Sequence, residues 1–259
     1  MSANNDTIGK TITVTVLLCV ICSVVVSAAA VLLKPQQEAN KLLDKRTNIL
    51  AAAGLLDPSK SVDESFEQIT TKVVDLETGK YTDAVDPQTY DARKAAKDPQ
   101  LSEALPRDKD IASIKRQANY QTVYLVEKEG KIEKVILPVH GYGLWSTLYG
   151  FLALEGDLNT VVGLGFYSHA ETPGLGGEVD NPIWKAQWPG KKVYDEGSTA
   201  PVLGLVKGKV DPSSPNAEHQ IDGLAGATLT SNGVTRLIEF WMGENGYAPF
   251  LANLKAGGV

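Results

Sequence analysis

Residues 120–143, YQTVYLVEKEGKIEKVILPVHGYG, decide the fold class of this chain. Two runs rich in β-branched and aromatic residues flank the dipeptide Glu129-Gly130, and this spacing is typical of a β-hairpin. Three further β-rich runs follow, separated by turns that contain glycine: Leu148 to Leu154, Thr160 to Tyr167 and Val202 to Lys207. Strands joined in this way predict a mostly antiparallel sheet.

The last predicted element is a helix from Asn232 to Met242. Its apolar residues lie on one helical face: Val234, Leu237, Ile238 and Trp241. Because a helix of this kind buries its apolar face against a neighbour, we expect it to pack on the sheet.

The segment before residue 116 contains helical signals and a polar stretch. Apolar residues at helical spacing continue to Gly54, and Asp57-Pro58 stops that helix. Ser61 begins the capping-box spelling Ser-Val-Asp-Glu. The apolar residues from there on share one helical face: Val62, Phe66, Ile69 and Val73. Lys80 to Lys115 is polar, without a sustained period, and we interpret it as an insertion or wrapped linker.

Thr11 to Leu33 is an uncharged run of 23 residues, closed by Lys10 and Lys34. At about 1.5 Å per residue it spans the roughly 30 Å hydrocarbon layer of a bilayer. A cleaved signal peptide is the alternative, because Ser27 to Ala30 mimics a cleavage site. The run is too long for a signal core, so we predict an uncleaved membrane anchor in contact with lipid.

The predicted fold class is therefore α+β, with an N-terminal transmembrane helix before the sheet domain. Residues 1–9 form a short tail, 10–34 the transmembrane helix, 35–115 a helical and irregular linker with its insertion, and 116–259 the domain with a mostly antiparallel sheet and flanking helices. Basic residues are frequent after the span, at Lys34, Lys41, Lys45 and Arg46. A literal count of them places the domain in the cytoplasm.

Composition excludes several classes of function. A formal net charge of −6 provides no basic stripe for phosphate backbones, so nucleic acid is not expected as a partner. Cys19 and Cys22 are the only cysteines, and both lie in the apolar run as apolar fillers. The three histidines, His140, His169 and His219, are dispersed, and we expect no metal site. Redox chemistry would need a bound cofactor.

The segment IDGLAGATLTSNGVTRLIEFW, residues 221–241, carries the strongest chemical signal. Gly223 and Gly226 allow close approach of the backbone to a ligand. Hydroxyl groups follow just before the predicted helix, on Thr228, Thr230 and Ser231. A helix N-terminus with hydroxyl groups and small residues is a phosphate site. On spacing alone the alternative stays open that Thr230 or Ser231 caps the helix and the glycines serve the turn.

A second glycine-rich segment, SHAETPGLGG, covers Ser168 to Gly177. It is not a dinucleotide fingerprint, because no G-x-G-x-x-G spacing opens a helix here. Taken by itself, a segment of this composition is also explained as a plain turn.

Both segments resemble motifs of covalent FMN-binding domains. Asp222 to Thr228 resembles the D-x-x-(S/T)-G-A-T flavinylation motif, in which a separate FMN transferase links FMN to the last threonine through a phosphoester. Ala225 departs from the usual Ser or Thr, but the acceptor hydroxyl of Thr228 is present. ETPGLG, residues 171–176, resembles the signature loop of the same domain, in which Pro173 stiffens the chain while glycines let backbone N–H groups reach the flavin ring. The resemblance implies FMN on Thr228 and cofactor contacts from Asp222, Gly226, Ala227, Thr230, Ser231, Glu171, Thr172, Gly174, Leu175 and Gly176.

Over nearly its whole length the chain is similar to the family of C subunits of the sodium-translocating NADH:quinone oxidoreductase. The match includes the anchor, GLWST at 143–147, both flavin motifs and the tail GYAPFL at 246–251. Tyr142 departs from the basic residue that is common in the family. The resemblance implies a redox subunit of a Na⁺-transporting NADH:ubiquinone reductase that is not catalytic alone and has no catalytic residue beyond the flavin.

The same resemblance implies partners and location. FMN would receive an electron from an iron-sulfur centre of the complex and pass it to a second FMN on a neighbouring membrane subunit. The chain would cross the bacterial inner membrane once, with residues 1–9 in the cytoplasm and the FMN domain in the periplasm. We prefer this orientation to the count of basic residues, because large domains translocate largely regardless of charge.

Two further residues are candidates for ring contacts. Trp145 could stack near the isoalloxazine, with a buried core position as the alternative. Lys207 could stabilise a reduced anionic flavin, with a solvated lysine at a strand end as the alternative. Two rival functions also stay open: the G subunit of the related ion-translocating ferredoxin:NAD oxidoreductase, and a membrane-tethered scaffold subunit without flavin.

Overall fold

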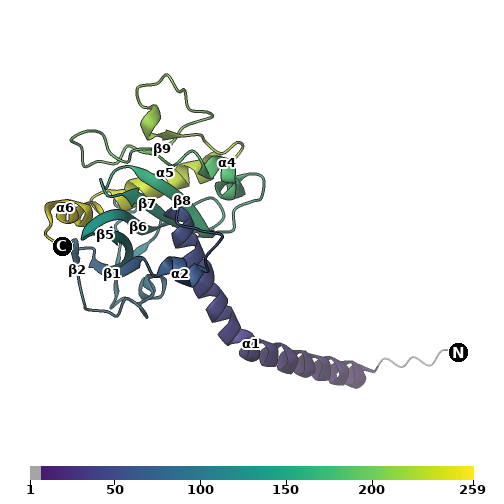
Figure 1. The fold of residues 1–259 in the computed structure, drawn as a ribbon. Helices are drawn as coiled ribbons and strands as arrows, with labels where there is room; N and C mark the ends of the chain where they lie inside the picture. The colour runs from purple at the N-terminus through teal and green to yellow at the C-terminus, as the bar shows by residue number, and fades with distance from the viewer. Residues whose placement is uncertain (1–6) are drawn as a thin grey trace. The chain divides into compact units, whose positions relative to one another are not determined.

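The structure, a computed structural model, describes residues 7–259. The N-terminal helix α1 covers Ile8–Ala52 as one continuous helix, with Pro35 inside it (Figure 1). The predicted anchor and the helical segment after it are therefore parts of one element. The helix ends at Ala52, before the predicted stop at Asp57-Pro58, and Gly54 follows with a φ of +65°. Residues 1–6 of the predicted tail lie outside the described residues, and Ile8 already belongs to α1.

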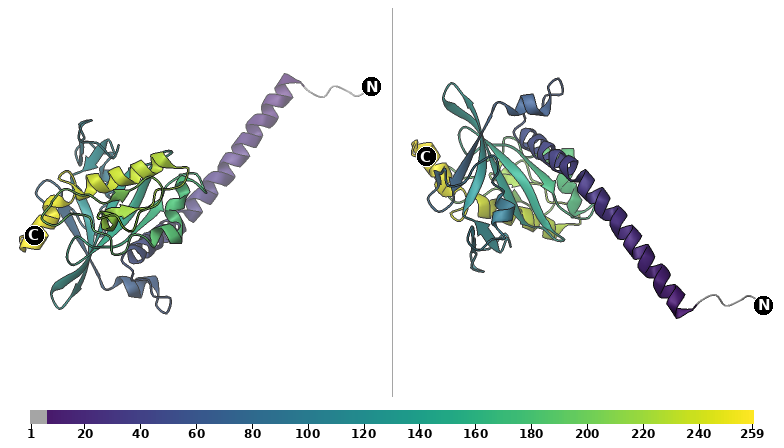
Figure 2. Two further views of the ribbon diagram at one scale, coloured as in Figure 1. Left: turned by 90° about the horizontal axis from the view of Figure 1, so that it is seen from above. Right: turned by 90° about the horizontal axis from the view of Figure 1, so that it is seen from below.

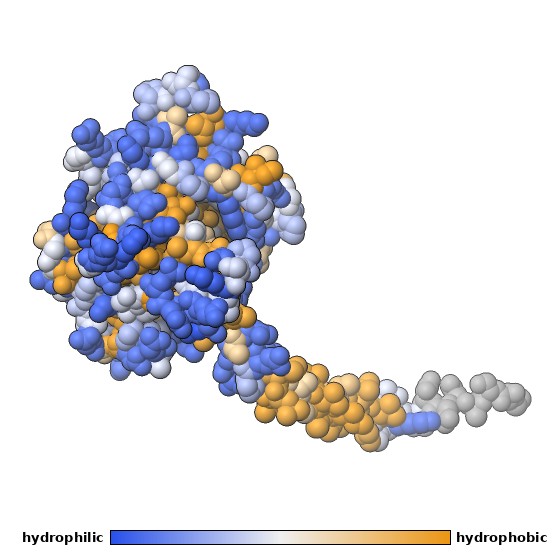
Figure 3. Space-filling view, in the orientation of Figure 1, coloured by the Kyte–Doolittle hydropathy of each residue, from blue (hydrophilic) through white to orange (hydrophobic). Residues whose placement is uncertain are grey.

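The chain divides into two compact units, Met1–Asp44 and Lys45–Val259. In the first unit, the side chains of residues 7–44 are exposed, and most of this stretch is apolar (Figure 3). α1 is long and apolar enough to cross a membrane, and among residues 7–259 it is the one helix with this property.

The second unit is built on a six-stranded sheet with the order β2-β1-β5-β6-β7-β8. Each neighbouring pair is antiparallel. The strands are β1 Ile69–Asp75, β2 Lys80–Tyr81, β5 Tyr120–Lys128, β6 Lys131–Tyr142, β7 Thr147–Glu155 and β8 Val161–Ser168. The predicted hairpin is confirmed: Glu129 and Gly130, with φ of 53° and 74°, form the turn between β5 and β6.

Sequence reasoning was partly wrong about the first strand. Ser61 does cap α2, Val62–Phe66, with the full capping box to Glu64. Ile69 and Val73, which we expected on the same helical face, lie instead in β1, where both are buried. Because β1 pairs along its whole length with β5, long-range pairing overrides the local helical spacing. The predicted boundary at residue 116 therefore does not coincide with an edge of the sheet.

Several smaller elements complete the unit. The stretch 80–115, expected to lack a sustained period, includes α3 Ala92–Ala95 and β3 Ser102–Ala104, which pairs with β4 Arg116–Ala118. We predicted a strand from Val202 to Lys207, but only β9, Gly204–Leu205, forms there. It pairs in parallel with β10, Gln220–Ile221. Three short helices lie between β8 and β10: η1 Gly176–Asp180, α4 Pro182–Lys185 and η2 Ala217–His219. A last helix that we did not predict, α6, covers Ala248–Ala256.

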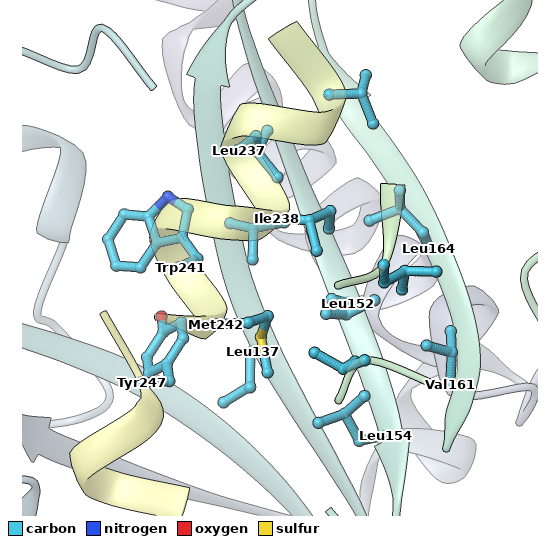
Figure 4. Packing of buried hydrophobic residues seen from close by; sticks show 14 of the residues in the cluster. Leu137, Leu152, Leu154, Val161, Leu164, Leu237, Ile238, Trp241, Met242 and Tyr247 are labelled. Carbon is cyan, nitrogen blue, oxygen red and sulfur yellow. The ribbon is translucent and has the colours of Figure 1, made fainter. Parts of the chain in front are cut away.

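The long helix α5, Thr228–Met242, packs across one face of the sheet (Figures 1 and 2). Its apolar side chains, including Leu237, Ile238 and Trp241, pack against Leu137 and Leu152 of the sheet (Figure 4). The last turns of α1 cover the other face, where Ile49 and Leu50 join a second buried cluster with Tyr124, Ile136 and Phe151. The sheet between these two layers fixes the position of the N-terminal end of α5.

That end lies four residues earlier than predicted, since α5 begins at Thr228 and not at Asn232. The difference matters for the chemistry of the segment. Thr228 occupies the first helical position, and Thr230 and Ser231 lie inside the first turn.

Candidate functional site

Three segments that are distant in sequence meet at the N-terminal end of α5. The turn 143–146 joins β6 to β7, the loop 169–177 follows β8, and residues 222–227 lead into α5. A Cβ atom at Gly233 would lie 2.5 Å from the carbonyl oxygen of Tyr142, and one at Gly226 would lie 3.0 Å from Cδ2 of Leu175. The structure thus brings the GLWST, ETPGLG and flavinylation motifs together.

Glu171 lies at the centre of this site and is only 5% exposed. Its carboxylate accepts hydrogen bonds from the backbone N–H groups of Leu144 at 3.1 Å, Trp145 at 3.0 Å and Ser146 at 3.3 Å, and from the Thr230 hydroxyl at 2.7 Å. Burial by itself raises the pKa of Glu171, but these hydrogen bonds outweigh it and hold the pKa below its usual value. The group is therefore an ionised carboxylate surrounded by protein donors.

The three hydroxyl groups near the start of α5 differ sharply in accessibility. Thr230 is fully buried and donates to Glu171. Ser231 is buried as well; its hydroxyl donates to the carbonyl of Ala227 and accepts from the N–H of Leu224. Thr228 is exposed, and within residues 7–259 its hydroxyl makes no hydrogen bond. Of the three, Thr228 is the hydroxyl that another molecule can reach.

The N-terminus of α5 has no side-chain cap. Ala227 stands at the N-cap position, so the alternative that Thr230 or Ser231 caps the helix is wrong. The first N–H groups of a helix have no partner inside the helix, and they carry the positive end of its dipole. With Gly226 and Ala227 beside it, this end can hold a phosphate group attached to Thr228.

Asp222 has its hydrogen bonds inside the protein. Its Oδ1 atom accepts from the N–H of Val210 at 2.8 Å, and its carbonyl oxygen accepts from the indole of Trp184 at 2.9 Å. The N–H of Gly223 donates to the carbonyl of Gly208. These bonds hold the loop that carries Lys207 beside the flavinylation segment, and Lys207 itself is exposed.

The ETPGLG loop has an exposed tip and a buried base. The carbonyl of Thr172 accepts from the N–H groups of Leu175 and Gly177, and Gly174 has a φ of +75° at the exposed tip. Gly176 is buried, and a Cβ there would lie 2.6 Å from the Thr230 hydroxyl. The prediction that its backbone N–H reaches the flavin ring stays a prediction, while the side where a Cβ would stand is filled by Thr230 and Glu171.

Sequence reasoning gave His169 no role beyond its place beside this loop. Its Nδ1 atom accepts from the N–H of Glu171 at 3.2 Å, and its Nε2 atom lies 2.8 Å from Asp180. Lys185 lies 3.5 Å from the same carboxylate. His169 therefore ties the loop to Asp180 of η1, which is bonded in turn to Lys185 of α4, and a sequence without spatial information does not reveal this.

Exposed apolar side chains surround the site. Trp145 is 65% exposed, so the alternative that it is a core residue is wrong. Leu175 and Leu229 are also exposed, at the loop and in the first turn of α5. Leu229 was not among the predicted site residues. Its apolar side chain next to the candidate acceptor Thr228 was a signal that could have indicated it. In residues 7–259, no group of three or more His, Cys, Asp or Glu could hold a metal ion.

The fold and the site define a protein with a membrane-type helix and an FMN-binding domain, and comparisons with known proteins agree. The family model of the FMN-binding domain matches residues 143–243. The chain is 59% identical to the C subunit of the Na(+)-translocating NADH-quinone reductase of Pseudomonas aeruginosa, over 98% of this chain and 99% of the relative. It is 50% identical to the protein of the same name from Vibrio vulnificus, over 99% of both chains.

A solved structure gives the same result for the fold. The crystal structure of Shewanella oneidensis NqrC matches with a TM-score of 0.76 and 37% identity, covering 84% of this chain and 99% of that chain. The chain therefore belongs to the family of C subunits of the Na(+)-translocating NADH-quinone reductase. The predicted fold class and the resemblance to this family are confirmed.

Proposed function

We propose that this chain carries FMN as a phosphoester on Thr228 and relays electrons through it inside the membrane complex. One observation carries the proposal: Thr228 presents the one accessible hydroxyl at the uncapped N-terminus of α5, between exposed apolar side chains. The phosphate of FMN needs the helix N-terminus, and its ring needs the apolar side chains beside it. When bound, FMN supplies one-electron and two-electron redox chemistry that no side chain offers.

The residues of the chain bind and orient the cofactor. The backbone N–H groups of the first turn of α5 hold the phosphoester, and the helix dipole stabilises its negative charge. Trp145, Leu175 and Leu229 cover the ring and exclude water from it. Lys207 offers a cation on the loop that Asp222 fixes, which would stabilise a reduced anionic ring.

The partners follow from the proposed relay. The electron comes from an iron-sulfur centre of the complex and leaves to an FMN on a neighbouring membrane subunit, while NADH oxidation and sodium transport take place on other subunits. A separate FMN transferase forms the ester during maturation. Asp222 supports that step by fixing the segment that the transferase must recognise, through its bond to Val210.

We also propose that the FMN domain lies in the periplasm and that residues before the span lie in the cytoplasm of a bacterial inner membrane. The basic residues after the span argue for the opposite orientation, but a domain of this size translocates largely regardless of charge. Protease added to intact spheroplasts should cleave beyond Lys34. Cleavage restricted to the first ten residues would contradict this orientation.

Intact-mass measurement tests the attachment site. The full chain, produced with the transferase, should be heavier than its sequence by one FMN less one water. Thr228→Val keeps the branched shape and removes the acceptor oxygen, so the added mass should disappear. Thr235→Val, a matched change two turns further along α5, should keep it.

In the assembled complex, Thr228→Val should abolish quinone reduction, while NADH oxidation by artificial acceptors upstream should survive. An adduct that persists in Thr228→Val, or maps to Thr230 or Ser231, would contradict the assignment. A colourless parent protein would favour the scaffold function instead.

A further inference from the structure

We propose that Glu171 is a positioning residue whose carboxylate locks the turn that carries Trp145 to the first turn of α5, and so sets the place of the indole relative to the cofactor on Thr228. This inference rests on the function proposed above. It assigns to Glu171 a role that it exerts through the protein and not by touching the flavin.

The carboxylate bonds to two different segments, and one of its oxygens reaches α5. Oε1 accepts from three consecutive backbone N–H groups, those of residues 144–146, which together form an anion-binding nest. Oε2 accepts from the Thr230 hydroxyl at 2.7 Å, two residues after Thr228 in α5, and more distantly from the N–H of Leu144 at 3.3 Å. The carboxylate is thus a bridge between the Trp145 turn and the helix that carries the attachment site.

Two glycines make room for this bridge. A Cβ at Gly143 would lie 2.6 Å from Oε1 of Glu171, and a Cβ at Gly176 would lie 2.7 Å from Oε2. Neither glycine has a φ in the left-handed region, so space and not backbone conformation explains both. The two glycines flank the carboxylate, one beside each oxygen.

Direct contact with the cofactor does not explain these observations. Glu171 is nearly fully buried, and its two oxygens already accept hydrogen bonds from three backbone N–H groups and one hydroxyl of the protein. If its charge is removed, one of the two acceptor oxygens is lost and the remaining hydrogen bonds are no longer charge-assisted, which weakens the link between the turn and the helix. The exposed residue that the bridge holds is Trp145, and its indole is what the cofactor meets.

The test uses the full chain, produced with the transferase and purified in detergent. Glu171→Gln keeps the shape but removes the charge and one acceptor oxygen. The added mass of FMN should remain, the melting temperature should fall by about 4–8 °C, and flavin emission should rise because a displaced indole no longer quenches it. Glu178→Gln is a matched control, since Glu178 lies on η1 and bonds to Asn181; it should leave the emission unchanged.

A double-mutant cycle separates positioning from general stability. Trp145→Phe should raise flavin emission in the parent background and add nothing in the Glu171→Gln background. Equal increases in both backgrounds, an unchanged emission in Glu171→Gln, or no effect of Trp145→Phe in the parent would each overturn the proposal. Absence of the FMN mass from the parent would instead overturn the proposed function.

If Glu171→Gln does not fold, Thr230→Val provides the same test from the helix side. It removes one bond of the bridge and leaves the turn bonded to Glu171. The folded variant should show a smaller loss of quenching, and emission identical to the parent would overturn the proposal.

Discussion

Gly143→Ala should destabilise the domain although alanine is the smallest possible side chain. The new Cβ would lie 2.6 Å from Oε1 of Glu171, 3.0 Å from its Cδ and 3.1 Å from Cδ1 of Leu148. Leu148 is fully buried and Glu171 nearly so, so neither side chain can move into solvent. The carboxylate must shift away from its three N–H donors. Loss of one or two charge-assisted hydrogen bonds lowers the free energy of unfolding by about 2–4 kcal/mol.

Thermal unfolding of the full chain in detergent, followed by near-ultraviolet circular dichroism, measures this loss. The melting temperature should fall by about 4–16 °C, since 1 kcal/mol shifts it by roughly 2–4 °C in a domain of this size. Gly165→Ala is the matched control, because Gly165 lies in β8 with nothing within 4 Å of a Cβ placed there. That change should be neutral or slightly stabilising. A Gly143→Ala protein as stable as the Gly165→Ala protein would refute the claim that Glu171 is held rigidly.

Three other predictions concern charge. Burial and the nearby Arg93 cation lower the pKa of His140 to about 4. Between about pH 6.5 and pH 4, the unfolded chain therefore binds more protons than the folded one. The free energy of unfolding decreases as the pH falls through this range. His140→Gln should flatten this loss, measured as melting temperatures at pH 7 and pH 5; equal losses would contradict it. Lys207→Gln should lower the midpoint potential of the bound flavin in a spectroelectrochemical titration, and an unchanged potential would leave Lys207 as a solvated residue. Arg93→Ala should cost roughly 1 kcal/mol in urea unfolding, because its guanidinium stacks 3.6 Å above the ring of Tyr149; no change would show that the stacking contributes nothing.

Local signals predicted those parts of the fold that depend on near neighbours. The hairpin at Glu129-Gly130 and the capping box at Ser61 formed as expected, since turn and cap residues act within a few positions. β1 was missed because the spacing of Ile69 and Val73 also fits a helix, and only pairing with β5 decides between the two. Long-range partners of this kind are invisible in a single sequence.

The same limit applied to the site. Motif resemblance indicated the segments that meet at the start of α5, but not what each residue does there. Threonine is a common helix-capping residue, yet the hydroxyl of Thr230 bonds to Glu171, 59 residues earlier in the chain. Gly176 lies in a glycine-rich segment of the kind that is typical of flexible loops, yet it is buried beside that hydrogen bond. Roles set by partners from another segment could be assigned only from the structure.

The hydrogen bonds of Thr230 and Ser231 also support the attachment that we propose at Thr228. By accepting from Thr230, the carboxylate holds that hydroxyl in the interior, and Ser231 is occupied in the same way by Ala227 and Leu224. Of these three hydroxyl groups, the transferase that we propose would therefore find only that of Thr228 free, at the helix end that favours a phosphate. The carboxylate that links the first turn of α5 to the Trp145 turn thus also keeps the Thr230 hydroxyl from acting as an acceptor, while bonds within the segment itself occupy Ser231.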